Sequence, residues 1–139
     1  MENEIKILQT PLRVKEVYSS CCDGGAGAVN MFIGTVRNKT QSKAVLRLEY
    51  EAYESMAAKE LLKLANQAAE KWPVLKIVIH HRVGILHIGD EAVVIAVSTP
   101  HRKDSFEACK YIIDTLKKTV PIWKKEVFED GEEWVSANP

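Results

Sequence analysis

A continuous apolar run, Ala92 to Val97, constrains the fold of this chain more than any other segment. A strand that faces water on one side alternates apolar and polar residues, whereas an uninterrupted run needs apolar cover on both faces. The run therefore predicts a central strand with packed elements above and below it. The chain has 139 residues, which is enough to bury such a core as one domain, residues 1–139.

Two long segments with helical periodicity supply part of that cover. One runs from about Ser55 to Trp72 and is ended by Pro73, and the other begins near Asp104 and is ended by Pro121. The spacing of Asp104 and Glu107 fits a capping box at the start of the second helix. The predicted buried stripes are Ala57, Leu61, Leu64, Ala65, Ala68 and Trp72 in the first helix, and Phe106, Cys109, Ile112, Ile113, Leu116 and Val120 in the second.

The remaining segments predict strands and one short helix, which Pro11 begins and which ends at about residue 20. The expected strands are 4–9, 26–37, 44–53, 75–86, 92–97, 122–128 and 133–135. Within 44–53, the apolar Val45, Leu46, Leu48 and Tyr50 alternate with charged residues. The order β-α-β-β-α-β-β-α-β-β indicates an α+β domain with a mixed or antiparallel sheet and about three helices.

Composition excludes several classes of protein. Nineteen basic residues balance nineteen acidic ones, which argues against a dedicated nucleic-acid binder. No apolar run approaches the roughly 18 residues of a membrane span, and the N-terminus shows no signal-peptide pattern. The cysteines, Cys21, Cys22 and Cys109, lack a CxxC pattern and favour a reducing compartment, so we expect a cytoplasmic protein. The spacing of the histidines matches no zinc motif, and no metal site is expected.

Basic residues concentrate in one stretch of this neutral chain. Residues 101–125 hold seven basic and three acidic side chains, which fits either an anion site or a solvated helix face. His101 and Arg102 lie just before the second long helix, whose free N–H groups favour anions. The pair is thus a candidate phosphate or carboxylate cradle, and the alternative is a turn residue beside a surface arginine.

Lys117 and Lys124 lie on either side of Pro121, which folds the chain back on itself. Two lysines that converge lower each other's pKa, and a lysine with a lowered pKa can act as base, acid or nucleophile. The alternative is a pair of ordinary surface lysines. Arg37 either projects into a cleft or only marks the end of its strand, where Gly34 permits a close backbone approach.

Several motifs in fixed order resemble one known family, the large, catalytic subunit of molybdopterin synthase, also called MoaE. The resemblance covers about residues 5–135. The matching motifs are Phe32-Ile33-Gly34-Thr35-Val36-Arg37-Asn38, His81-Arg82-Val83-Gly84-x-Leu86-x-Ile88-Gly89-Asp90, His101-Arg102, Phe106-Glu107-Ala108 and Pro121-Ile122-Trp123-Lys124-Lys125-Glu126.

The resemblance implies an α/β-hammerhead fold and a sulfurtransferase activity. Members of the family convert cyclic pyranopterin monophosphate into molybdopterin, the dithiolene that carries molybdenum. Their sulfur comes from a small ubiquitin-like carrier subunit whose C-terminal Gly-Gly ends as a thiocarboxylate. The large subunit forms a homodimer that binds two carriers in a heterotetramer. No cofactor, nucleic acid or membrane is implied.

The resemblance also assigns residues. Lys117 and Lys124 match the two lysines regarded as catalytic. The matching substrate-binding positions are Thr35, Val36, Arg37, His101, Arg102, Lys125 and Glu126. Many relatives continue past the final Trp-Val pair with a tail that contains an arginine, so the role of such a tail stays open. The competing hypothesis is a non-catalytic module of the same fold that binds an anion or docks a carrier.

Overall fold

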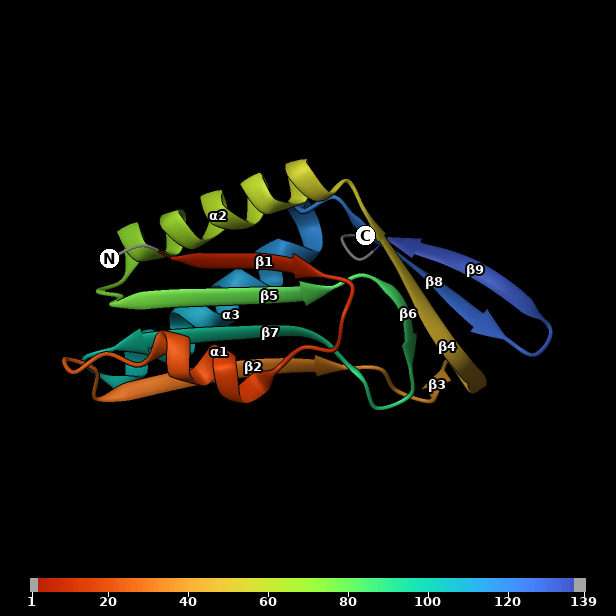
Figure 1. The fold of residues 1–139 in the computed structure, drawn as a ribbon, viewed down its shortest axis with the longest axis horizontal. Helices are drawn as coiled ribbons and strands as arrows, with labels where there is room; N and C mark the ends of the chain where they lie inside the picture. The colour runs from red at the N-terminus through yellow and green to blue at the C-terminus, as the bar shows by residue number, and fades with distance from the viewer. Residues whose placement is uncertain (1–2, 137–139) are drawn as a thin grey trace.

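The computed structural model describes residues 3–136, in which three helices and nine strands are formed (Figure 1). The helices are α1 (Val14–Cys21), α2 (Glu54–Lys71) and α3 (Arg102–Thr119). The strands are β1 (Glu4–Leu8), β2 (Ala28–Thr35), β3 (Lys39–Thr40), β4 (Lys43–Ala52), β5 (Lys76–Arg82), β6 (Gly84–His87), β7 (Glu91–Thr99), β8 (Ile122–Phe128) and β9 (Gly131–Ser136). The predicted α+β class with three helices is confirmed.

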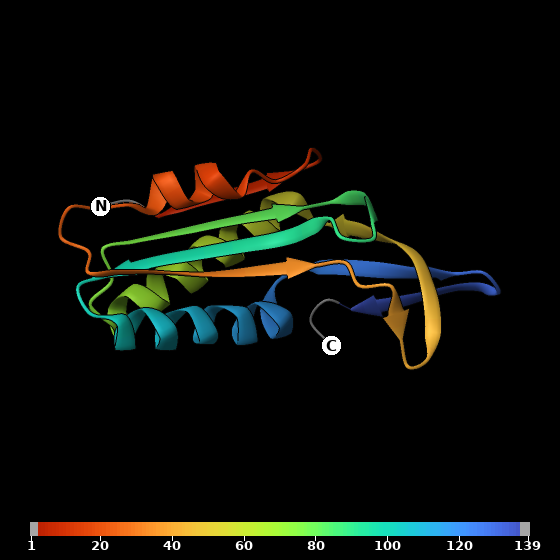
Figure 2. The ribbon, with the colours of Figure 1, turned by 90° about the horizontal axis from the view of Figure 1, so that it is seen from below.

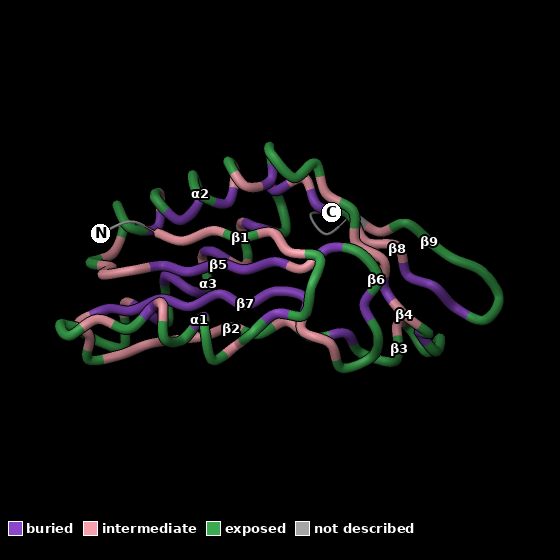
Figure 3. The backbone as a smooth tube through the Cα atoms, in the orientation of Figure 1, coloured by how far each residue is buried: buried purple, intermediate pink, exposed green. Residues whose placement is uncertain are grey.

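The first sheet has the strand order β1-β5-β7-β2. Strands β1 and β5 are parallel, and the other neighbours are antiparallel. Helix α1 covers one face of this sheet, and α2 and α3 cover the other (Figure 2). The apolar run of β7 lies in the middle of these layers and is buried from Ala92 to Thr99 (Figure 3). The prediction of a central strand covered on both faces is confirmed.

Strand alternation divides the core of the first sheet between its two faces. Ile77 and Ile79 of β5 pack against α2 and α3, whereas Val78 packs against α1. Each buried aliphatic side chain of this kind contributes about 1.5–3 kcal/mol to the stability of the fold. The predicted stripe of α2 is confirmed, with Leu61 and Ala65 fully buried and Trp72 packed at its end.

The second sheet has the order β3-β4-β8-β9, and β6 pairs with β4 beside this path. It extends past the end of the helical layers (Figure 1). Its own small core consists of Val36, Val45, Leu48, Leu86, Ala92 and Phe128. Most of β9 is exposed (Figure 3), so this sheet has fewer buried side chains to hold it than the first.

Two strand predictions were wrong at specific residues. The expected strand 75–86 is two strands, because Gly84 has a φ of +97° and its backbone turns the chain from β5 in the first sheet to β6 in the second. Leu46, which the predicted alternation grouped with Val45, Leu48 and Tyr50, is exposed, because the pairing of β4 with β8 shifts register between Val45 and Arg47. Such an irregularity changes which side chains face the core.

The start of α3 also differs from the sequence prediction. The helix begins at Arg102, His101 is its N-cap, and no side chain caps it. The capping box is therefore wrong: Glu107 instead pairs with Lys103 at 3.0 Å and accepts a hydrogen bond from the Trp72 indole at 3.1 Å. Phe106, predicted to be buried, is 57% exposed, because the face of α3 turned toward the core is the one that carries Ser105, Ala108 and Ile112.

Candidate functional site

A cavity of about 440 Å³ lies among the strands of the second sheet and the end of β2. Residues from both halves of the chain form its walls. They are Thr35, Arg37, Thr40, Gln41, Leu48, Tyr50, Lys124, Glu126, Glu133 and Val135. Thr35, Arg37, Lys124 and Glu126 were named from the sequence as candidates, and the fold brings these four together.

Cross-strand register decides which side chains face this cavity. Tyr50 of β4 lies opposite Lys124 of β8, and Lys124 lies opposite Val135 of β9. Directly opposed residues in antiparallel strands project from the same face of the sheet. Two residues further along β8, Glu126 lies opposite Leu48 of β4 and opposite Glu133 of β9. Lys124 and Glu126 of β8 therefore face the cavity, and Lys125 between them faces away.

The exit of β2 sets the positions of Thr35 and Arg37. The register of β2 with β7 shifts between Gly34 and Thr35. The next residue, Val36, is buried; its N–H donates to Asp90 at 3.0 Å and its carbonyl accepts from Gly89 at 2.8 Å. The side chain and backbone of Val36 are thus used by the fold. Val36 thereby fixes its neighbours Thr35 and Arg37 at the cavity wall.

Glu126 is a carboxylate held inside the cavity wall, with only 7% of its surface exposed. The Thr40 hydroxyl donates a hydrogen bond of 2.6 Å to its Oε2 atom. This bond joins β3 to β8, which are 86 residues apart in sequence. A hydrogen bond to a charged group is short and strong, so the Glu126 side chain has a fixed orientation.

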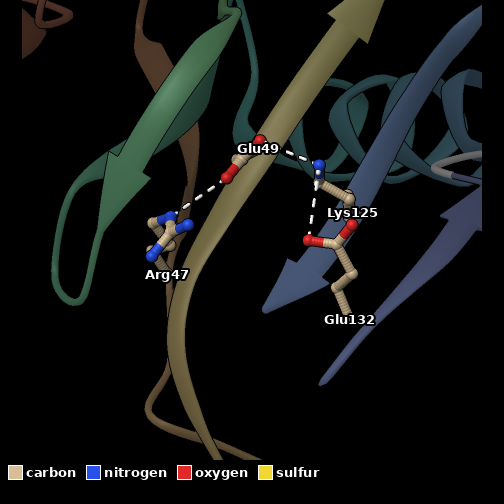
Figure 4. A network of polar contacts seen from close by, with 4 residues as sticks. All are labelled: Arg47, Glu49, Lys125 and Glu132. Carbon is tan, nitrogen blue, oxygen red and sulfur yellow. Dashed lines mark hydrogen bonds and ion pairs between the residues drawn. The ribbon is translucent and has the colours of Figure 1, made fainter. Parts of the chain in front are cut away.

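Lys125 lies on the opposite face of the second sheet from the cavity. Its ammonium pairs with Glu49 at 3.2 Å and Glu132 at 3.6 Å, and Glu49 also pairs with Arg47 (Figure 4). The hydrogen bond to Glu49 is the main reason that the pKa of Lys125 is raised. In this chain Lys125 therefore stabilises the outer face of the sheet and does not line the cavity.

Lys117 is exposed in the last turn of α3, which leads through Pro121 into β8 (Figure 1). It is not among the residues that line the cavity. Only two residues lie between the end of the helix and the start of β8, and Lys124 is the third residue of that strand. The connection keeps Lys117 at the end of α3 that adjoins the second sheet.

His101 and Arg102 lie at the opposite end of α3. Both are exposed, and the Thr99 hydroxyl donates to the His101 carbonyl at 2.7 Å. Fifteen helical steps at 1.5 Å each separate Arg102 from Lys117, a distance of about 22 Å along the axis. Within one chain, the pair is therefore remote from the cavity.

The cavity combines cationic, acidic and neutral polar groups. Arg37 and Lys124 can bind an anionic group, and the Arg37 guanidinium can do so with two parallel hydrogen bonds. Glu126 and Glu133 can accept hydrogen bonds from donor groups on the same ligand. Among residues 3–136, no cluster of three or more His, Cys, Asp or Glu side chains is arranged to hold a metal ion. No described helix is long and apolar enough to span a membrane.

Six residues of the cavity wall were not singled out from the sequence, namely Thr40, Gln41, Leu48, Tyr50, Glu133 and Val135. The alternation along 44–53 does place Leu48 and Tyr50 on one face. Nothing in that pattern distinguishes a face that packs against a core from one that borders a cavity. For Thr40 and Gln41, a short polar hairpin gives no local signal at all.

The fold and the cavity define the class of this protein: an α+β domain in which an open second sheet carries a ligand-sized, mixed-charge site. Comparison with known sequences makes the assignment specific. The profile of the family described as "MoaE protein" matches residues 7–119. The molybdopterin synthase catalytic subunit of Halalkalibacterium halodurans is 52% identical over 93% of this chain and 83% of that protein. The chain belongs to the MoaE family.

Solved structures agree with this assignment. Molybdopterin synthase from Staphylococcus aureus superposes with a TM-score of 0.90 at 44% identity, over 93% of this chain and 94% of that one. A complex of subunits 1 and 2 of molybdopterin-converting factor from Helicobacter pylori matches with a TM-score of 0.78 at 23% identity, over 94% and 89% of the two chains. The second match bears on the fold alone.

Proposed function

We propose that this chain is the catalytic subunit of a molybdopterin synthase. It transfers sulfur from a thiocarboxylated carrier protein to cyclic pyranopterin monophosphate and so forms the dithiolene of molybdopterin. The observation that carries the proposal is the cavity in which Arg37 and Lys124, from family motifs 87 positions apart in the sequence, line one wall with Glu126. The names of the relatives support the same activity.

The substrate and the donor explain the charges of the site. A cyclic phosphate and a thiocarboxylate are both anions, and Arg37 and Lys124 attract them by charge and hydrogen bonding. We assign Lys124 to orient the substrate or the thiocarboxylate. We assign Lys117 to proton transfer or to a covalent intermediate during sulfur insertion, because a lysine ammonium can supply a proton and its neutral amine can accept one.

The carrier supplies the reactive sulfur, so the chain needs no cysteine nucleophile. The burial of two of the chain's own cysteines is consistent with this. Cys21 and Cys109 are buried, and burial raises the pKa of the Cys109 thiol to about 11 and that of Cys21 above its ordinary value. A thiol that stays protonated is a poor nucleophile. Cys22 is exposed on the far side of the first sheet, at the end of α1.

The partner in this proposal is a small ubiquitin-like subunit whose Gly-Gly tail enters the cavity. In Helicobacter pylori, subunits 1 and 2 of molybdopterin-converting factor form a complex, and we extend a two-subunit arrangement to this chain as part of the proposal. Glycine side chains add no bulk, so a tail of this type suits a site of about 440 Å³ that the pterin substrate must share. A cytoplasmic location, where thiols and thiocarboxylates stay reduced, is part of the proposal.

A homodimer accounts for His101 and Arg102, which lie about 22 Å from Lys117 on the same helix. If they bind the same substrate, a second copy supplies them, with its α3 antiparallel to the first. A shallow depression between β2 and α3, lined by Phe32, Phe106 and Ile113, offers an apolar surface for that contact. Two carriers on the dimer give the heterotetramer.

Mixed dimers test this arrangement. A dimer that combines a Lys124→Ala chain with an Arg102→Ala chain retains one intact site if the two residues act across the interface. Random mixing of the two variants then restores about one quarter of the wild-type activity. If the residues act within one chain, every site carries a substitution and no activity returns.

Reconstitution tests the function itself. The purified chain is mixed with thiocarboxylated carrier and cyclic pyranopterin monophosphate, and molybdopterin is measured as its fluorescent oxidised derivative. Product that depends on all three components supports the proposal. Carrier binding without product favours the alternative, a docking module of the same fold. Absence of both product and carrier binding contradicts the proposed partner.

A further inference from the structure

Tyr50 is a cavity residue to which the resemblance assigns no role. Its ring makes an edge-on contact with the His81 ring, with 5.3 Å between centroids and 73° between planes. Burial lowers the pKa of His81 to about 4, so this imidazole is neutral at pH 7, and its Nδ1 lies 2.8 Å from the Arg82 carbonyl. The neutral ring donates at that position. The Tyr50 ring is therefore held by a rigid, uncharged neighbour.

The Tyr50 hydroxyl is in a different situation from the ring. It makes no hydrogen bond with any residue between 3 and 136. Within that range, the Arg82 Nε is the only buried side-chain nitrogen or oxygen that lacks a partner. The hydroxyl oxygen is therefore accessible to solvent, and the accessible space beside Tyr50 is the cavity that it lines.

The hydroxyl also stays protonated throughout the physiological range. Burial, and then the nearby Glu126 carboxylate, raise the pKa of Tyr50 to about 12. The group is thus a hydrogen-bond donor that has no protein acceptor in range. Thr40 already donates to Oε2 of Glu126 at 2.6 Å, which fixes that carboxylate toward β3.

Lys124 lies directly opposite Tyr50 on the neighbouring strand, on the same face of the sheet. Side chains of such a pair are about 5 Å apart at Cβ. The Lys124 ammonium and the Tyr50 hydroxyl can both donate hydrogen bonds, and the positive charge of the ammonium makes an anion the ligand that suits the pair. Phenylalanine would make the same ring contact with His81, so the packing of the fold does not require the hydroxyl.

We propose that Tyr50 is a substrate-contacting residue whose hydroxyl donates a hydrogen bond to an anionic oxygen or sulfur held between it and Lys124. The inference rests on the proposed function and deepens it. Two groups in that reaction have the required chemistry: the cyclic phosphate of the pterin and the thiocarboxylate at the carrier tail. The experiment separates them.

The test is Tyr50→Phe, which keeps the ring and its contact with His81 and removes only the hydroxyl. Tyr53→Phe is the matched control, because Tyr53 is 61% exposed and lies outside the cavity wall. Loss of a hydrogen bond to a charged group predicts a fall of about 10- to 100-fold in kcat/KM. The unfolding midpoint should match that of the wild type, and Tyr53→Phe should stay within twofold in activity.

The separate kinetic constants identify the anion. A raised KM for the pterin assigns the hydroxyl to the phosphate, and a raised KM for the carrier assigns it to the thiocarboxylate. A lower kcat alone assigns it to an anion that forms in the transition state. Unchanged values of all three constants overturn the inference.

Binding measurements keep this inference distinct from the proposed function. Inorganic phosphate and a carrier with an ordinary C-terminal carboxylate are each titrated calorimetrically into wild type and Tyr50→Phe, and no turnover is needed. If the wild type makes no molybdopterin but the variant binds either probe more weakly, the proposed function fails and the anion contact stands. Equal affinities of the two proteins for both probes, together with unchanged kinetics, overturn it.

Discussion

The two sheets of this protein differ in how completely helices cover their faces. The first sheet is enclosed by helices on both faces, and its central strand β7 is buried almost throughout. The second sheet extends beyond the helices and carries charged side chains, of which Lys124 and Glu126 face the cavity. Enclosure gives the first sheet its stability, and openness gives the second its site.

The contrast explains where charged side chains are tolerated. A carboxylate or ammonium inside the first sheet would lose its hydration without a partner. On the second sheet the charged side chains contact solvent or a partner. Glu126 accepts a hydrogen bond from Thr40, and Arg47, Glu49, Lys125 and Glu132 form a network of ion pairs (Figure 4). The difference predicts that substitutions in the first sheet change stability and those around the cavity change activity.

The largest expected effect is on turnover. Lys117→Ala should lower product formation by about 10²- to 10⁴-fold, the range for loss of a general acid or base, and should leave the proposed dimer intact. Lys118→Ala, at the adjacent exposed position, is the control and should remain near wild type. Product formation is measured in the reconstituted system, and near-normal turnover of Lys117→Ala would refute its assigned role.

The second prediction tests whether buried side chains of the first sheet contribute more to stability than exposed ones of the second. Ile95→Ala, at a fully buried position of β7, should lower the free energy of unfolding by about 2–5 kcal/mol through lost burial and a cavity. Ile85→Ala, at a position in the second sheet that is 54% exposed, should cost less than about 1 kcal/mol. Urea unfolding measures both values. Equal losses would mean that the two sheets are equally enclosed.

The third prediction concerns the loss of stability at acidic pH that follows from His81, whose ring contacts Tyr50 of the second sheet. His81 of β5 has a folded pKa of about 4, because burial disfavours its charged form, and an unfolded pKa near 6.5. The unfolded chain binds the proton more readily, so stability is retained above about pH 6.5 and falls as the pH drops toward 4. The loss reaches roughly 3 kcal/mol. Urea unfolding at several pH values measures it, and His81→Phe should flatten the profile.

The smallest effect is expected at the bond between β3 and β8. Thr40→Val removes the donor to Glu126 and should lower the free energy of unfolding by about 1–2 kcal/mol. It should also weaken substrate binding, because the Glu126 carboxylate loses its fixed orientation. Thr40→Ser keeps a hydroxyl and is the matched control. If Thr40→Val and Thr40→Ser have the same KM for the pterin, Thr40 does not act through Glu126.

Local patterns were sufficient for most elements of this fold. The stripe of α2, the central strand β7 and the proline that ends each long helix follow from periodicity and backbone sterics. The patterns were insufficient where a single backbone feature changed the outcome. Gly84 divides one predicted strand between two sheets, and the irregularity after Val45 exposes Leu46. The φ of Gly84 leaves no trace in the spacing of apolar residues, and the adjacent apolar pair Val45-Leu46 does not show which of the two faces the core.

The candidate site was predictable in part for a related reason. Arg37, Lys124 and Glu126 belong to contiguous motifs, which a resemblance can match position by position. Lys125 belongs to the same motif, yet strand alternation turns it to the opposite face. Thr40 and Tyr50 lie outside the matched motifs, and only the pairing of β4 with β8 shows that Tyr50 shares a rung with Lys124.

The sequence by itself determined the class of fold and the family, because these depend on periodicity and motif order. The tertiary structure alone decided which charged side chains share a cavity. Sheet register and the length of α3 are long-range properties: the first places Tyr50, Lys124 and Glu126 on one face, and the second separates Arg102 from Lys117. No local stretch of sequence contains either relation.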